Sequence, residues 1–162
     1  MRRGVSMKIT ITEMTPEELP EVMELEREVF SWPWTEGMFR DEMDRDYSFI
    51  FLAREPSGLL VGFICFWMLI DEAHILNLGI RKRYRRLKIA SKLTLAALKF
   101  CCLRGAGAAT LEVREKNNAA IRLYKSLGFV EAGLRRNYYE SPPDNAVIMW
   151  RYDISSGLEK SP

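Results

Sequence analysis

The sequence predicts a single domain of mixed α/β class, in which a central, mostly antiparallel sheet carries helices on both faces. The chain has 162 residues, of which 48% are apolar and 28% charged, a size and composition typical of one globular domain. Strand-like and helix-like apolar patterns follow one another along it in the order β-α-α-β-β-β-α-β-α-β-β. With no repeat and no long linker, we expect one domain over 7–154 and flexible termini at 1–6 and 155–162, and either Met1 or Met7 as the start.

In the first half of the chain, turn and cap residues separate the elements. Thr15 and Glu18 have the spacing of a capping box, and Pro16 stands at the first helical position, so we expect a helix from there to Phe30. Thr35 is placed to cap a short second helix. The apolar patterns predict strands at 8–12, 48–53, 59–70 and 74–80, with a hairpin turn at 55–58.

The second half alternates helices and strands. Apolar residues at helical spacing predict a helix from Ile89 to about Arg104, which Gly105 ends. Asn117 opens a further helix and Gly128 ends it. Strands are expected at 108–113, 129–134 and 147–152, the last two joined through 141–144.

The formal net charge of +2 conceals two segments of opposite charge. The acidic segment, 13–46, holds 12 acids and 3 bases, whereas the basic segment, 81–92, holds 7 bases and no acid. Because the basic segment lies between a strand and a helix start, it is placed to bind an anion at free N–H groups, which favours a compact phosphate ligand. A solvated basic face stays open, as does a nucleic-acid surface, since Tyr84 lies among the arginines.

Other classes are disfavoured by what the chain contains. Cys65, Cys101 and Cys102 are odd in number and without metal-ligand spacing, so we expect free thiols in a reducing cytoplasm. With His74 as the one histidine, neither a metal site nor a Ser-His-Asp triad is expected. The longest uncharged apolar run is 59–70, shorter than the ~20 residues of a spanning helix. We therefore expect a cytoplasmic protein without a secretory signal or membrane partner.

Several motifs resemble those of the GNAT superfamily of N-acetyltransferases. Tyr-Arg-Arg-Leu-Lys-Ile-Ala at 84–90 is similar to its pyrophosphate loop, Q/R-x-x-G-x-G/A, with Lys88 in place of the first glycine. Residues 111–129 are similar to L-E-V-R-x-x-N-x-x-A-I-x-L-Y-x-x-L-G-F of the bacterial ribosomal-protein alanine N-acetyltransferases. Arg-Arg-Asn-Tyr-Tyr at 135–139 and Trp-Pro-Trp-Thr-Glu at 32–36 resemble that branch too. The resemblance covers most of the chain from 13 to 152.

The resemblance implies that acetyl-CoA is the cosubstrate and that a peptide amine attacks its thioester directly. It places Glu112 as the base and Tyr124, on the next helix, as the acid. Asn117 suits a helix cap as well as the coenzyme, and Asn77 suits a neighbouring strand as well as the acceptor. The implied coenzyme-binding residues are Leu78, Gly79, Ile80, Arg85, Arg86, Leu87, Lys88, Ile89, Ala90, Ser91, Asn117 and Tyr124. The implied acceptor-binding residues are Trp34, Asn77, Tyr138 and Tyr139, the two tyrosines on a loop.

The acceptor class follows from the basicity of amines. An α-amine with a pKa of about 7.7–8.0 is roughly one-tenth neutral at pH 7, whereas a lysine near 10.4 is neutral in only about four parts in ten thousand. A single carboxylate base therefore favours an N-terminal protein amine, such as that of a ribosomal protein. The acidic segment is expected to attract a cationic acceptor. An acetyltransferase for a small amine or lysine, and a non-catalytic CoA- or RNA-binding module, stay open.

Overall fold

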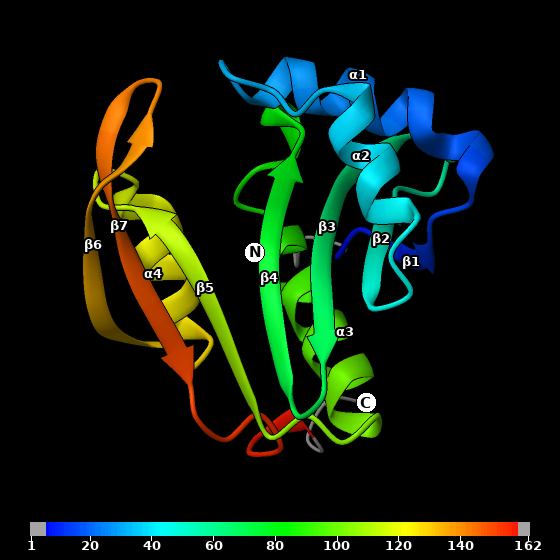
Figure 1. The fold of residues 1–162 in the computed structure, drawn as a ribbon. Helices are drawn as coiled ribbons and strands as arrows, with labels where there is room; N and C mark the ends of the chain where they lie inside the picture. The colour runs from blue at the N-terminus through cyan, green and yellow to red at the C-terminus, as the bar shows by residue number, and fades with distance from the viewer. Residues whose placement is uncertain (1–5, 159–162) are drawn as a thin grey trace, which may run out of the picture.

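The structure is a computed structural model that describes residues 6–158, so most of the termini expected to be flexible lie outside the described residues. Its seven-stranded sheet has the order β1-β2-β3-β4-β5-β7-β6 (Figure 1), and only β4 and β5 pair in parallel. The predicted mixed, mostly antiparallel sheet is confirmed. The strands are β1 (Thr10–Glu13), β2 (Ser48–Arg54), β3 (Leu60–Leu69), β4 (Glu72–Ile80), β5 (Ala108–Arg114), β6 (Val130–Glu140) and β7 (Pro143–Arg151).

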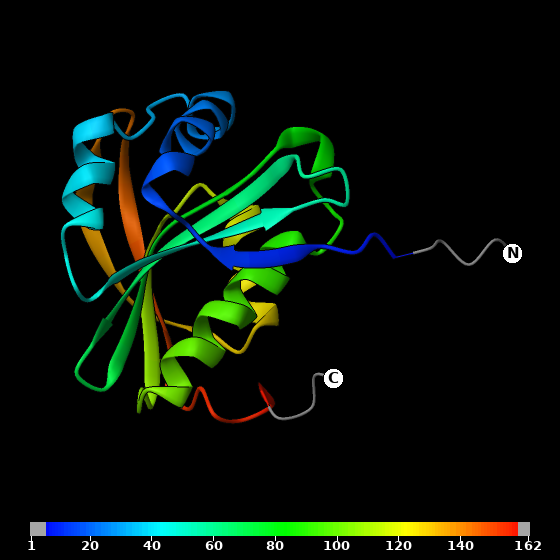
Figure 2. The ribbon, with the colours of Figure 1, turned by 90° about the vertical axis from the view of Figure 1, so that its right-hand side faces the viewer.

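Both faces of the sheet carry helices, as predicted (Figure 2). One face packs Leu25 and Phe39 of the first two helices against Phe63 of β3. The other face packs Leu93 of the third helix and Ile121 of the fourth against the sheet, with Phe66 and Leu111 in the same cluster. The helices are α1 (Leu19–Val29), α2 (Glu36–Met43), α3 (Ile89–Leu103) and α4 (Asn118–Ser126), and single 3-10 turns cover Pro16–Glu18 and Lys82–Tyr84.

The predicted helix starts are confirmed by their cap hydrogen bonds. The backbone N–H of Thr15 donates to Glu18 Oε2 at 2.8 Å. The Thr35 hydroxyl accepts from the N–H of Met38 at 3.2 Å. Asn117 Oδ1 accepts from the N–H of Ala120 at 3.1 Å, so Asn117 is a helix cap. These bonds satisfy donors that a helix start otherwise leaves unpaired.

The sheet separates between β4 and β5. The two strands pair only from Glu72 with Ala108 to Ile75 with Leu111. A register shift against β3 follows at once, since Ile75 lies opposite Phe66 and Asn77 opposite Cys65. Beyond it β4 and β5 diverge, whereas β5 keeps its pairing with β7 as far as Arg114 (Figure 1). The divergence leaves the ends of both strands open to a shared space.

Two predicted boundaries are wrong, because β7 begins at Pro143 and not at 147 and because β6 extends past 134. The segment 135–139, expected as a loop that carries Tyr138 and Tyr139, belongs to β6, which runs to Glu140. Arg135 pairs with Ala146 and Tyr139 with Asp144 of β7, across an irregularity at Asn137, where φ is 54°. The sequence pattern misses this extension because β6 is an edge strand with nearly every residue exposed, so polar residues carry no burial penalty there.

Candidate active site

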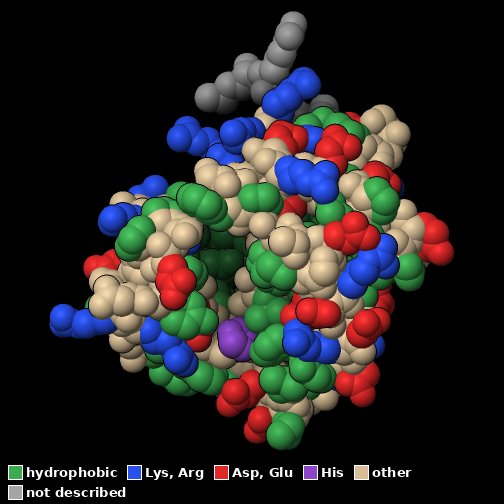
Figure 3. All heavy atoms as spheres, turned by 45° about the horizontal axis from the view of Figure 1, so that its top comes forward, with side chains coloured by type: hydrophobic (Ala, Val, Ile, Leu, Met, Phe, Trp, Pro, Cys, Tyr) green, Lys and Arg blue, Asp and Glu red, His purple; other side chains and the backbone are tan. Residues whose placement is uncertain are grey.

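A cleft of about 320 Å³ opens where β4 and β5 diverge. Hydrophobic side chains surround the hollow on this face of the molecule (Figure 3). Helix α4, strands β4, β5 and β6, and the segment around α1 supply its walls. The cleft brings together seven of the predicted site residues, which are Trp34, Asn77, Leu78, Glu112, Asn117, Tyr124 and Tyr139.

Glu112 reaches the cleft from β5 and is ringed by polar groups. Its side chain is 20% exposed, and its Oε1 lies 3.4 Å from Nε of Arg135 on β6. The Tyr138 hydroxyl donates a hydrogen bond to this carboxylate, which raises the pKa of Tyr138. Tyr138 therefore contacts Glu112 without lining the cleft itself. A partly exposed carboxylate in this position can take up a proton directly or through a water molecule.

Tyr124 reaches the same cleft from α4 and is only 6% exposed. Its ring packs against Phe129 at a centroid distance of 5.6 Å. Burial raises the pKa of its hydroxyl, which keeps the group protonated. Among the described residues, every fully buried side-chain N or O has a hydrogen-bond partner. The Tyr124 hydroxyl has none there, so it is not fully buried and opens to the cleft. Tyr124 thus presents a proton donor.

The basic segment forms an anion-binding turn at the start of α3. Arg86 and Lys88 have φ of 64° and 61°, and the first helical hydrogen bond there is from Lys92 N–H to the Lys88 carbonyl. The N–H groups of Ile89, Ala90 and Ser91 are therefore left free at the helix start. Within residues 6–158, six of the seven basic side chains make no ion pair. Free N–H groups and unneutralised cations at one helix start fit a pyrophosphate group.

The other implied coenzyme residues lie apart from the cleft. Gly79, Ile80 and the run 85–91 are not among its lining residues. The Ile89 side chain is 1% exposed and packs in the core, so only its backbone can meet a ligand. A Cβ at Gly79 would lie 3.0 Å from Phe63 Cε1, within the packing of α1 against the sheet. The predicted site residues thus fall into two groups, one in the cleft and one in the basic turn that follows β4.

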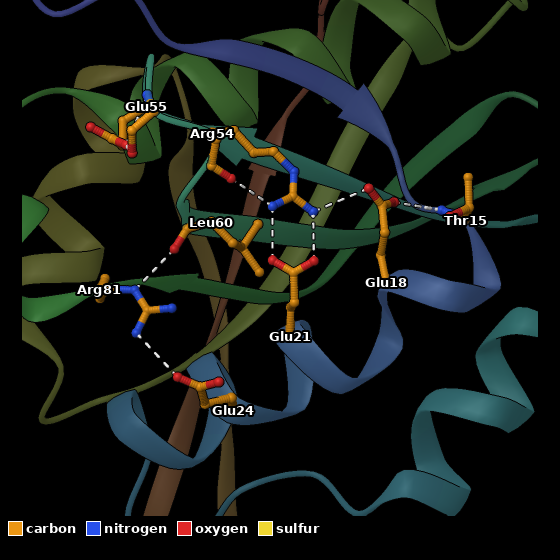
Figure 4. A network of polar contacts seen from close by, with 10 residues as sticks. Thr15, Glu18, Glu21, Glu24, Arg54, Glu55, Leu60 and Arg81 are labelled. Atoms are coloured by element: carbon orange, nitrogen blue, oxygen red, sulfur yellow. Dashed lines mark hydrogen bonds and ion pairs between the residues drawn. The ribbon is translucent and has the colours of Figure 1, made fainter.

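Six of the twelve acids of the acidic segment form ion pairs with arginines of the same chain, some of which Figure 4 shows. Arg54 on β2 binds Glu18 and Glu21. Arg81, the seventh base of the basic segment, turns to α1 and lies 2.5 Å from Glu28 and 3.9 Å from Glu24. Glu36 and Glu42 pair with Arg40 and Arg45. Half of the acids expected to attract a cationic acceptor are therefore held in ion pairs, and the other six form none with the described residues.

Sequence reasoning missed two charged residues of the cleft, Glu26 and Arg114. Glu26 of α1 is 1% exposed; its Oε1 accepts from the Trp34 N–H at 2.9 Å and its Oε2 from Asn77 Nδ2 at 3.0 Å. Burial raises the pKa of this carboxyl. Arg114 lies over the Tyr139 ring at 4.1 Å, and burial raises the pKa of Tyr139 to about 12. The available signal for Glu26 was an acid on the apolar stripe of its helix, where a buried charge is uncommon.

The comparisons with known proteins decide the family. Residues 19–129 match the acetyltransferase (GNAT) family. A Bacillus subtilis protein, provisionally named a [ribosomal protein bS18]-alanine N-acetyltransferase, is 34% identical over 88% of this chain and 95% of its own. The chain belongs to the GNAT acetyltransferase family. The resemblance found in the sequence is confirmed, and this GNAT protein is an acetyltransferase.

Solved structures agree with the GNAT assignment. The crystal structure of the Escherichia coli ribosomal-protein-S18-alanine N-acetyltransferase is 30% identical, with a TM-score of 0.84 over 96% of this chain and 99% of that chain. Arabidopsis thaliana NAA60 in complex with acetyl-CoA shares the fold, with a TM-score of 0.80 at 19% identity over 90% of this chain and 99% of its own. That structure contains acetyl-CoA, the cosubstrate that the sequence resemblance implies for this chain.

Three further features of the described residues bear on the sequence expectations. None of the helices there is long and apolar enough to cross a membrane. No group of three or more His, Cys, Asp or Glu side chains among residues 6–158 is arranged to hold a metal ion. Cys65, Cys101 and Cys102 are free thiols.

Proposed function

We propose that this GNAT protein acetylates the N-terminal α-amine of a protein acceptor, with Glu112 as base and Tyr124 as acid. The observation that carries the proposal is the cleft between β4 and β5, which a carboxylate and a protonated tyrosine enter from different elements. The acceptor class is supported by the E. coli relative, which acts on the alanine of ribosomal protein S18. A ribosomal protein with an N-terminal alanine is therefore the acceptor to test first.

The basic turn supports binding of the coenzyme. The free N–H groups of Ile89, Ala90 and Ser91 and the side chains of Arg85 and Arg86 are suited to its pyrophosphate. Lys88 adds a cation where the family loop has a glycine. The turn follows directly on β4, whose Leu78 lines the cleft, so a ligand held at the turn can extend along β4 toward Tyr124.

Bound acetyl-CoA supplies the activated acetyl group, and the protein supplies two proton transfers. Glu112 accepts a proton from the acceptor's ammonium, directly or through water, which leaves the amine neutral for attack on the thioester carbonyl carbon. The new C–N bond forms as the C–S bond breaks, and Tyr124 donates its proton to the departing sulfur. The acetylated nitrogen then loses its extra proton, which restores the Tyr124 phenol, and Glu112 releases the first proton to solvent. We expect activity to rise with pH as the amine deprotonates. Because burial keeps Tyr124 protonated, activity should not decrease at any pH up to 10.

The other side of the cleft is built for a peptide. Trp34 and Tyr139 line it with aromatic surface, and Arg114 fixes Tyr139 from above its ring while donating to the carbonyls of Ser141 and Pro142. Tyr138 contacts the Glu112 carboxylate from outside the lining of the cleft. These contacts support Trp34, Tyr138 and Tyr139 as acceptor-side residues.

The test is acetyl transfer to a peptide with an N-terminal alanine, followed by release of free thiol. The same peptide with its α-amine blocked, a lysine peptide and a polyamine complete the panel. Turnover should require the free α-amine. Acetylation of a lysine in the blocked peptide, or of the polyamine alone, would contradict this acceptor class and identify a lysine or a small amine as the acceptor.

Tyr124→Phe and Glu112→Gln test the two proton transfers. Each should lower kcat by about 10²–10⁴-fold, the usual contribution of a general acid or base. Affinity for acetyl-CoA, measured by calorimetry, should stay unchanged in Glu112→Gln, because Glu112 is not among the implied coenzyme-binding residues. Full activity in Tyr124→Phe would remove the acid from the mechanism.

A further inference from the structure

Glu26 is the one acid of α1 that faces the cleft, and it differs from its neighbours in its partners. Glu18, Glu21, Glu24 and Glu28 all meet arginines, whereas Glu26 makes no ion pair with any described residue. It is also far more deeply buried than they are. A buried carboxylate without a cation is costly unless hydrogen bonds compensate it. Its two hydrogen bonds therefore indicate what it is there to hold.

Both partners of Glu26 are candidate acceptor-binding residues. Oε1 accepts from the backbone N–H of Trp34, which lies after α1, and Oε2 accepts from the side-chain amide of Asn77 on β4. Trp34 and Asn77 are 43 residues apart in the chain, and Glu26 joins them on one side of the cleft. One carboxylate thus fixes two groups that face the same space.

The chemistry of the pair fixes how the Asn77 amide is turned. An ionised carboxylate only accepts hydrogen bonds, so Asn77 must direct its NH₂ group at Glu26. Its carbonyl oxygen, Oδ1, then has no partner among residues 6–158, and no side-chain N or O buried there is left unsatisfied. Oδ1 is therefore open to the cleft as a hydrogen-bond acceptor.

We propose that Glu26 is a positioning residue that presents Asn77 Oδ1 to an N–H group at the amino end of the entering acceptor. The inference rests on the proposed function, because it assigns a part of the acceptor site. It also explains why an asparagine stands in the apolar stretch 75–80 of β4, beside the register shift. Substrates that offer an N–H donor at this depth gain a hydrogen bond, and substrates that lack one leave a buried carbonyl unpaired.

Glu26→Gln breaks the arrangement with a minimal change of shape. Glutamine offers one acceptor and one donor, so either the Trp34 N–H or the Asn77 NH₂ faces another donor. The Asn77 amide is then free to turn and to present its NH₂ to the cleft. We expect KM for the alanine peptide to rise about tenfold, with a smaller change in kcat and an unchanged KM for acetyl-CoA.

A second substitution should restore the pattern. In Glu26→Gln/Asn77→Asp, the introduced glutamine side chain accepts from Trp34 and donates to the new carboxylate, whose other oxygen still accepts in the cleft. We expect KM for the peptide to return to within about threefold of the wild type, a coupling typical of residues in direct contact. Asn77→Asp alone sets two carboxylates against each other and should be at least as impaired as Glu26→Gln. Glu24→Gln, on the exposed side of the same helix, is the matched control and should change neither KM.

The kinetic series is run with thermal unfolding of each variant, on whichever acceptor the substrate panel identifies. A Glu26→Gln protein that folds and keeps the wild-type KM for that acceptor overturns the inference, as does a double variant no better than either single one. If Glu26→Gln does not fold, the double variant and Asn77→Asp decide in the same way. Failure of the proposed function is a separate result: the wild-type protein would then not acetylate free N-terminal amines.

Discussion

The acidic and basic segments differ in where their charge is used. In the acidic segment, Glu18, Glu21 and Glu28 reach arginines in other parts of the fold, and their charge holds α1 to the sheet. In the basic segment, six side chains make no ion pair within the described residues and surround free N–H groups. Two segments that look alike as runs of charge therefore have different roles. One contributes to the fold, and the other is available to a ligand.

The largest expected effect concerns the available charge. Arg85→Gln/Arg86→Gln removes two cations from the basic turn, and charge-assisted hydrogen bonds contribute about 1.5–3 kcal/mol each. We expect the Kd for acetyl-CoA, measured by calorimetry, to rise about 10–100-fold and to depend less steeply on salt. The free energy of unfolding should change by less than about 0.5 kcal/mol, because both side chains are exposed. An unchanged Kd would show that these two side chains interact only with solvent and do not bind the coenzyme.

Arg81 is the exception that sharpens the comparison, because it lies in the basic segment but pairs with the acidic one. Its side chain is 13% exposed, contacts Glu28 and Glu24, and donates to the Leu60 carbonyl at 2.9 Å. Arg81→Gln should lower the free energy of unfolding by about 2 kcal/mol, as expected when a mostly buried charged donor to the Leu60 carbonyl and Glu28 is lost. Urea unfolding measures this loss. The folded variant should keep its Kd for acetyl-CoA, and weaker coenzyme binding would return Arg81 to the ligand site.

How far the sequence predicts the molecule depends on the range of the interactions. Helix starts at Thr15, Thr35 and Asn117 are local, since each cap contacts a residue three positions on, and all three are confirmed. The length of β6 is not local, because Arg135 and Tyr139 form a strand only through pairing with β7. An edge strand without a buried face leaves no alternating pattern to detect.

The candidate site shows the same limit. Motif resemblance predicted that Glu112 and Tyr124 act together, and both line the same cleft. It did not find Glu26, whose hydrogen bond to Asn77 joins residues 51 positions apart. It also could not separate Arg81 from the other six cations, because its partner Glu28 lies 53 positions away. Pairings across the fold are invisible until the sheet brings their elements together.

A smaller effect is expected at Lys88. This residue caps α3 with φ of 61°, a conformation that costs a non-glycine residue about 1 kcal/mol. Lys88→Gly removes that strain but adds freedom to the unfolded chain, so we expect a net gain of about 0.5 kcal/mol in unfolding free energy. Affinity for acetyl-CoA should fall about threefold through the lost cation. A variant that binds the coenzyme more tightly would show that Lys88 obstructs the turn.

The smallest expected effect is the acid sensitivity of the acidic segment. The hydrogen bond from Arg54 lowers the pKa of Glu21 below its ordinary 4.5, so this pair stabilises the fold above pH 4.5 and loses that contribution as the pH falls through the lowered pKa. Because Glu21 is half exposed, the contribution is below about 1 kcal/mol. Buried Glu26 has the opposite sign: its raised pKa makes the ionised form a cost that acid relieves. Urea unfolding of wild type and Arg54→Gln at pH 7 and pH 3 measures the joint contribution of the Arg54 ion pairs with Glu21 and Glu18. The gap in stability between the two proteins should narrow at pH 3, and a gap that stays constant would mean that Arg54 acts through packing and the Gly58 carbonyl instead of through charge.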